Sequence, residues 1–166
     1  TEWITNSVYA AHNGLHDYGR IPLWQPYLEF GEPLLDNPVG FVLNPFGSGL
    51  SLIMGAAQGL KYTVVLLTAL AGVGGWFMGW ALGLAWPGRM LLALLLLGKG
   101  NLHAMFNTGY FQLAHQQVYF PWLVGGLIAL ARLPRARWPV VLLALAFTLL
   151  FFAGNLWYTL PLLIVL

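Results

Sequence analysis

Acidic side chains, which suit general-base chemistry, are confined to the first 36 of the 166 residues. There are five of them: Glu2, Asp17, Glu29, Glu32 and Asp36. A carboxylate at a membrane surface can take the proton of a hydroxyl nucleophile or orient a cation. Glu2 opens a predicted helix, and we expect it to act as the catalytic base. The alternative role of Glu2 is to complement the dipole of that helix.

Two histidines follow Glu2 at a spacing that suits a shared ligand. His12 and His16 lie four residues apart, so on a helix both imidazoles face the same side. With Glu2 or Asp17 they offer a ligand set for a divalent metal, but we expect no metal and no other cofactor. We expect His12, His16 and the nearby Arg20 to contact an anionic group of a substrate. The alternative is a solvated helix face.

A second group of polar residues interrupts the apolar part of the chain. Residues 98–122 carry several amides, two histidines and one lysine between aliphatic flanks. Polar groups at membrane depth are costly and normally face a cavity or one another. We expect Lys99 to meet a phosphate as a point charge, and His103 and His115 to complete the same substrate site. The alternative is that these side chains only join helices inside the bundle.

Prolines exclude regular structure from residues 20–46. Each removes a backbone donor and restricts the preceding residue, and irregular backbone is not tolerated against lipid. We therefore expect this segment to lie outside the hydrocarbon or against protein. Within it, Glu32 and Trp24 are candidate substrate contacts, and the alternatives are turn chemistry and placement at the membrane interface. The prolines are Pro22, Pro26, Pro33, Pro38 and Pro45.

Composition indicates the environment in which these elements fold. The chain is 59% hydrophobic and 7% charged, with a mean hydropathy of +0.73, whereas soluble domains are about 25% charged. We therefore expect an all-α polytopic membrane protein with the lipid bilayer as its main partner. The scattered basic residues do not form a nucleic-acid footprint, and the absence of cysteine excludes a disulfide framework.

Hydrophobic periodicity places the helices. Residues 2–18 alternate polar and apolar side chains at helical spacing and predict an amphipathic helix. Leu60–Leu84 is long enough to span a membrane, for which about 20 residues suffice. A second long helix is expected over Tyr110–Ala131, and Trp138–Leu166 is expected to contain one kinked span or one span and the start of another.

The chain divides into two parts. We expect residues 1–46 to form an extracytoplasmic loop with its amphipathic helix, and residues 47–166 to form a bundle of about four or five spans. Because the sequence opens at Thr1 and closes within an apolar run, we expect it to be a fragment of a longer protein with a truncated bundle.

A stripe of small residues lies along the first predicted span. Ala71, Gly75, Gly79 and Gly83 recur every fourth position, a pattern that permits close helix approach. We expect this face to pack inside the chain rather than to form a dimer.

Arginines indicate the orientation of the bundle. Arg89 and the group Arg132, Arg135 and Arg137 are separated by an up-and-down pair of predicted spans, so we expect them on one side of the membrane. By the positive-inside rule that side is cytoplasmic. The N-terminal loop then lies outside the cell, where membrane-delivered donors replace nucleotide-activated ones.

One stretch of the loop resembles a known family. The sequence "GRIPLWQPYLEFGEPLLDNP", residues 19–38, resembles a signature in the first outer loop of YfhO-like membrane proteins, bacterial relatives of the GT-C glycosyltransferase superfamily. Weaker similarity continues in "FPWL" (120–123) and "AGNLW" (153–157). The residues that carry the main match are Gly19, Pro22, Leu23, Trp24, Pro26, Tyr27, Gly31, Pro33, Leu34 and Pro38.

This resemblance implies a GT-C-like helix bundle in the bacterial cytoplasmic membrane. It implies transfer of a sugar from a polyprenyl-phosphate donor to a cell-envelope acceptor at the outer face. Members of the superfamily place an acidic residue early in the first outer loop; Glu2 stands at that position, where many relatives have Asp. Two other function classes stay open: a non-catalytic accessory subunit of a membrane complex, and a lipid or solute transporter.

Overall fold

The computed structural model describes residues 2–20, 23–25, 31–33 and 44–153. This part of the chain is mostly helical, as expected. Its elements are α1 (Glu2–Tyr18), β1 (Trp24–Gln25), β2 (Glu32–Pro33), α2 (Gly47–Met54), α3 (Ala56–Ala81), α4 (Trp86–Leu97), α5 (Gly100–Thr108), α6 (Phe111–Arg132) and α7 (Trp138–Phe151).

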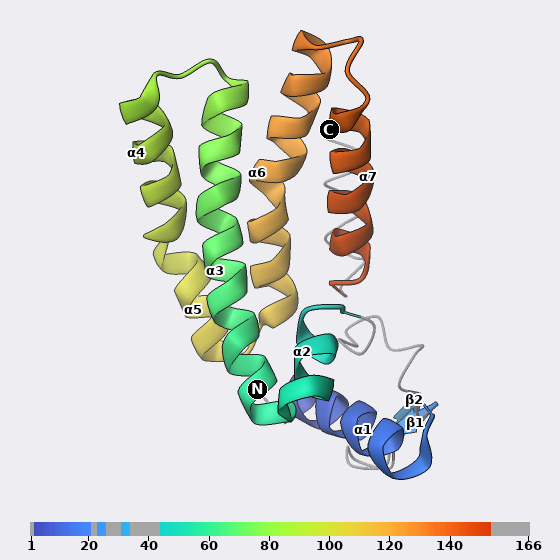
Figure 1. Cartoon of the computed structure of the whole chain (residues 1–166). Helices are drawn as coiled ribbons and strands as arrows, with labels where there is room; N and C mark the ends of the chain where they lie inside the picture. The colour runs from blue at the N-terminus through green and yellow to red at the C-terminus, as the bar shows by residue number, and fades with distance from the viewer. Residues whose placement is uncertain (1, 21–22, 26–30, 34–43, 154–166) are drawn as a thin grey trace.

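The helices form an upright bundle with a cross-lying base. Helices α3, α4, α6 and α7 run side by side, whereas α1 lies across one end of them with α2 in between (Figure 1). Helix α3 packs on α2, α4 and α6, and α6 also packs on α5 and α7. Helix α3 is therefore the central element of the described bundle.

Within the described residues, two segments are long and apolar enough to cross a membrane. They are Ala56–Ala81, which is α3, and Trp86–Thr108, which comprises α4 and α5. The predicted span Leu60–Leu84 was displaced by a few residues at each end. Glycines with positive φ explain both limits: Gly55 (φ 84°) turns the chain before α3, and Gly83 (φ 77°) turns it afterwards.

The small-residue stripe packs inside the chain, as predicted. A Cβ atom added to Gly75 would come within 3.0 Å of the Ala93 Cα atom, and one added to Gly79 within 3.1 Å of the Arg89 Cα atom. Both neighbours belong to α4. Because Gly75 and Gly79 have no side chain, the backbones of α3 and α4 approach closely. Small residues at helix interfaces commonly allow such close packing in lipid.

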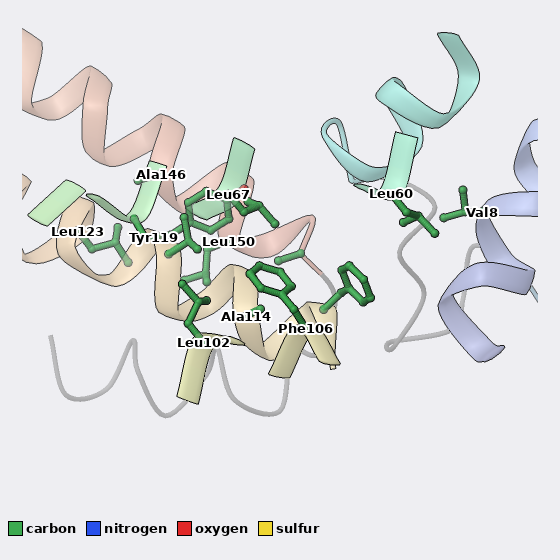
Figure 2. Packing of buried hydrophobic residues seen from close by; sticks show 14 of the residues in the cluster. Val8, Leu60, Leu67, Leu102, Phe106, Ala114, Tyr119, Leu123, Ala146 and Leu150 are labelled. Atoms are coloured by element: carbon green, nitrogen blue, oxygen red, sulfur yellow. The ribbon is translucent and has the colours of Figure 1, made fainter. Parts of the chain in front are cut away.

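The core lies between α3, α5, α6 and α7. Leu67, Leu123 and Leu150 are fully buried at its centre, and Leu102 and Phe106 of α5 join the same cluster. Figure 2 shows Val8 of α1 lying beside Leu60 of α3, apart from the main group. The amphipathic helix α1 is therefore attached to the bundle through its apolar face.

The N-terminal segment is partly regular. Helix α1 has the predicted bounds and is followed by Gly19 in a left-handed conformation (φ 65°), with the Arg20 N–H donating to the Gly14 carbonyl at 3.4 Å. Strands β1 and β2 pair antiparallel, with Trp24 opposite Pro33. This short pairing within the proline-rich segment was not predicted; proline is compatible with it because the sheet has only edge strands.

Several expected features lie outside the described residues. They include the acids Glu29 and Asp36, the prolines Pro22, Pro26 and Pro38, and the segment 154–166 with its "GNLW" match and Pro161.

Candidate functional site

The two ends of the bundle carry different polar residues. The histidine end comprises α1, α2, α5 and the first turn of α6, and the arginine end comprises the α3–α4 turn (residues 82–85) and the α6–α7 turn (residues 133–137). The two turns lie at the same end of the bundle, opposite α1 and α5 (Figure 1). All the predicted site residues belong to the histidine end or to the segment that precedes the bundle.

The predicted histidine pair forms on α1. The rings of His12 and His16 stack with centroids 5.9 Å apart and planes 8° apart. The Nδ1 atom of His12 lies 3.4 Å from Asn13 Oδ1, and that of His16 lies 3.1 Å from Asp17 Oδ1. Nε2 is thus the nitrogen through which each ring can bind a ligand. Because the two rings are stacked, one anion can contact the Nε2 edges of both.

Metal ligation has less support in this region. A metal site needs ring nitrogens that converge on one point together with a third ligand. Among the residues whose side chains are described, which exclude Glu2 and Glu32, no group of three histidine or acidic side chains is arranged to hold a metal ion.

For Glu2 and Glu32, the two acidic residues of the predicted site, the structure gives only the position of the backbone. Glu2 is the first residue of α1, and Glu32 lies in β2 opposite Gln25. The side chains of both acids lie outside the part of the chain that the structure describes. Arg20 is exposed just after α1, beside the turn that leads to β1.

Trp24 is held in an exposed position by the short hairpin. Its side chain is 54% exposed. Gly31, which has a φ of 89°, packs against the indole so closely that an added Cβ atom would overlap it. A positive φ and this overlap both restrict the position to glycine. The hairpin therefore fixes one face of Trp24 and leaves the other for an apolar or sugar surface.

Lys99 and His103 lie at the break between α4 and α5. Lys99 precedes α5 and is exposed. His103 places Nε2 3.0 Å from the carbonyl oxygen of Leu97, the last residue of α4. Helix ends leave carbonyl groups without an intrahelical partner. His103 therefore contacts the C-terminal end of α4, whereas Lys99 is exposed.

His115 lies inside the bundle. It is fully buried, its Nδ1 atom is 2.7 Å from the Phe111 carbonyl oxygen, and its ring centroid is 6.0 Å from that of Tyr119. Such a bond to the preceding turn ties the side chain to its own helix. Both of these contacts lie within α6.

The predicted site residues do not form one described cluster. In the regions for which side chains are described, no hydrogen bond or ring contact joins the α1 histidines to Lys99, His103 or His115. The structure instead gives three places: the α1 surface, the α4–α5 break and the core of α6.

A buried asparagine was missed by the sequence analysis. Asn44 is fully buried, and its Oδ1 atom accepts from the backbone N–H groups of Phe46 (3.0 Å) and Gly47 (2.9 Å). Its Nδ2 atom donates to the Phe152 carbonyl at 3.4 Å. Asn44 therefore joins the start of α2 to the end of α7. The Asn-Pro dipeptide before a helix was a signal for a turn, but its distant partner could not be deduced.

An apolar cavity inside the bundle was also missed. It has a volume of about 180 Å³ and lies between α3, α6 and α7, with Phe46 also in its lining. The Tyr119 ring lines it; Tyr119 is 2% exposed, and its hydroxyl has no hydrogen-bond partner within the described chain. The cavity is therefore almost entirely apolar and has room for only a short apolar group. Its other lining residues are Leu70, Trp122, Leu142, Leu145, Ala146 and Leu149.

Comparison with known proteins finds no matching family, no similar curated protein and no similar solved structure.

Proposed function

We propose that this chain belongs to a membrane glycosyltransferase that moves a sugar from a polyprenyl-phosphate donor to a cell-envelope acceptor at the outer face. The observation that carries the proposal is the juxtaposition of an apolar cavity with a polar bundle end. Phe46 lines the cavity and directly precedes α2 of the histidine end. A lipid-linked donor has a charged head and an apolar chain, and so needs both environments side by side.

The proposed chemistry is a single displacement. Glu2 takes the proton of an acceptor hydroxyl, and the oxygen attacks the anomeric carbon of the donor sugar. The bond from that carbon to the phosphate oxygen breaks, polyprenyl phosphate leaves with the electron pair, and the configuration inverts. His12, His16, Arg20 and Lys99 supply donors and positive charge for the phosphate.

The loop residues have supporting roles in this proposal. Trp24 offers its exposed face to the sugar, and Glu32 is the second acidic contact. The resemblance of residues 19–38 to YfhO-like proteins supports the same reaction class. We expect smaller effects on transfer from His103 and His115, because His103 lies 3.0 Å from the Leu97 carbonyl oxygen and His115 lies in the core of α6.

The decisive experiment replaces the base. The whole protein, in proteoliposomes, is assayed with a panel of synthetic polyprenyl-phosphate monosaccharides and an envelope extract as acceptor. General-base catalysis contributes about 10²–10⁴-fold, so Glu2→Gln is expected to lose that factor, while Glu2→Asp retains part of the activity. Full transfer by a correctly folded Glu2→Gln protein would contradict the mechanism.

An accessory, non-catalytic role is the second candidate. The separation of the described site residues into three places favours it. In that case the protein purifies with a stoichiometric partner, and substitution of Glu2 changes nothing. Because the α3 glycines are occupied by α4, such a partner would have to bind another face.

A transporter has less support from the charges of the chain. Cation-coupled transport uses acidic groups along a path through the membrane, and no acid follows Asp36 in this sequence.

A further inference from the structure

The arginine end carries a group of positive charges, and no acidic residue occurs in the two turns that form it. Six of the seven Lys and Arg residues follow Asp36, whereas every acid occurs at or before it. Four of the six occur in or next to the two turns of this end: Arg89, Arg132, Arg135 and Arg137.

Two of these arginines bond to the chain near the end of α3: Arg132 at its C-cap residue and Arg89 in the turn that follows. Arg89 Nε donates to the Leu84 carbonyl at 2.7 Å, and an Arg132 terminal nitrogen donates to the Leu82 carbonyl at 3.2 Å. The carbonyl end of a helix carries partial negative charge and attracts cations. These two side chains are therefore accounted for by the fold.

The other two arginines have no such role. Arg135 and Arg137 are exposed in the α6–α7 turn, and neither side chain has a hydrogen bond or an ion pair with a described residue. The turn is short and is closed by a bond from the Ala136 N–H to the Leu133 carbonyl at 3.0 Å. Both guanidinium groups are thus displayed on a defined segment at the start of α7.

Tryptophans indicate the depth of this turn. Trp138 follows Arg137 directly, is 42% exposed, and lies 6.0 Å from Phe77 and 5.9 Å from Trp80 between ring centroids. Tryptophan side chains concentrate at the headgroup level of bilayers. Arg135 and Arg137 then lie at the level of lipid phosphates. No acidic residue occurs in the first turn of α7 to compete for them.

We infer that Arg135, Arg137 and Trp138 form a binding site for the headgroup of an anionic phospholipid. The guanidinium groups bind the phosphate in the bidentate manner typical of arginine, and the indole packs on the glycerol and upper acyl region. The site is independent of glycosyl transfer and depends only on the insertion of the bundle in a membrane. It would select lipids of net negative charge over zwitterionic ones.

Native mass spectrometry of the whole protein, released from nanodiscs with equal amounts of phosphatidylglycerol and phosphatidylcholine, tests this site. Each arginine near a membrane surface contributes about a fivefold preference, so Arg135→Gln with Arg137→Gln should reduce anionic-lipid retention about thirtyfold. Arg135→Lys with Arg137→Lys keeps the charges and should retain a preference of intermediate size.

Lys61→Gln is the matched control, because Lys61 is an exposed cation near the start of α3, towards the opposite end of the bundle. An unchanged lipid preference in a folded double glutamine variant would overturn the site. An equal loss in Lys61→Gln would also overturn it, since the preference would then reflect total charge. Displacement of the lipid by millimolar inorganic phosphate would show a site for free anions instead.

Discussion

The histidine end and the arginine end of the bundle use their polar residues in opposite ways. At the arginine end, Arg132 bonds to the C-cap of α3, 50 residues away in the chain, and Arg89 bonds to Leu84 in the turn that follows α3. At the histidine end, His12 and His16 contact only the residue that follows each of them through Nδ1. Long-range bonds stabilise a fold, whereas side chains with local partners remain accessible to ligands.

From this difference we expect stability to depend on the bonds of the arginine end and ligand binding to depend on the surface of the histidine end. The arginine end combines capped helix termini with a tryptophan cluster. Substitution of its hydrogen-bonded residues should therefore lower the stability of the fold. The histidine end is attached through a few buried groups, chiefly Val8, Leu60 and Asn44, and its surface should tolerate change. The following predictions test this division from the largest expected effect to the smallest.

Asn44→Ala should cause the largest loss of stability. The substitution leaves two backbone N–H groups and the Phe152 carbonyl without the side chain that now bonds them. Each buried group left unsatisfied costs about 1–3 kcal/mol. The measurement is the midpoint of thermal unfolding in detergent, with Asn107→Ala on the exposed side of α5 as the matched control. Equal midpoints for the two variants would show that Asn44 does not anchor this end.

Gly75→Ala and Gly49→Ala should change stability in opposite directions. At Gly75 the new methyl group meets Leu96 and Ala93, and overpacking of this kind costs about 1–3 kcal/mol. At Gly49, in α2, nothing lies within 4 Å of the added atom, so the better helix propensity of alanine should add about 0.5–1 kcal/mol. The same unfolding assay applies. Stabilisation by Gly75→Ala would mean that α3 and α4 do not pack closely.

Arg132→Gln and Arg135→Gln should separate the two classes of arginine. Arg132 donates to the Leu82 carbonyl and covers Gly83, so its loss should cost about 1 kcal/mol. Arg135 has no described partner, and its replacement should leave the unfolding midpoint unchanged while lowering anionic-lipid retention. A destabilised Arg135→Gln protein would argue for a structural role and against the lipid site.

His16→Ala should have the smallest effect on stability. The His16–Asp17 pair is exposed on both sides, with 77% and 57% of the side chains accessible, and exposed pairs of this kind contribute little. Donor-phosphate binding should nevertheless weaken, which a titration of the whole protein with polyprenyl phosphate measures. His103→Ala is the contrasting variant, since His103 bonds to the Leu97 carbonyl and its loss should lower the unfolding midpoint.

Local patterns were sufficient to predict most helices. The bounds of α1 and the existence of α3 and α6 follow from hydrophobic periodicity and from the length of the apolar runs. The two arginine-bearing turns lie at the same end of the bundle, as expected, because the chain between them runs once down the bundle and once back up. The internal use of the glycine stripe was also expected, and the close α3–α4 contact confirms it.

The candidate site was predicted less completely. Spacing correctly placed His12 and His16 on one face of α1, because both residues belong to one helix. It could not place Lys99 or His115 relative to them, since their separation depends on how α5 and α6 pack. The burial of His115 and the bond of His103 to Leu97 both arise from that packing.

The sequence by itself determined what lies near in the chain: helices, turns, the segregation of acids from arginines and the apolar character of the bundle. These properties depend on side chains a few residues apart. Only the tertiary structure decided that Asn44 meets Phe152, 108 residues away, and that Arg132 meets Leu82. It also decided that Tyr119 lines a cavity between three helices. Such contacts depend on the crossing and rotation of whole helices, which many weak packing interactions set together.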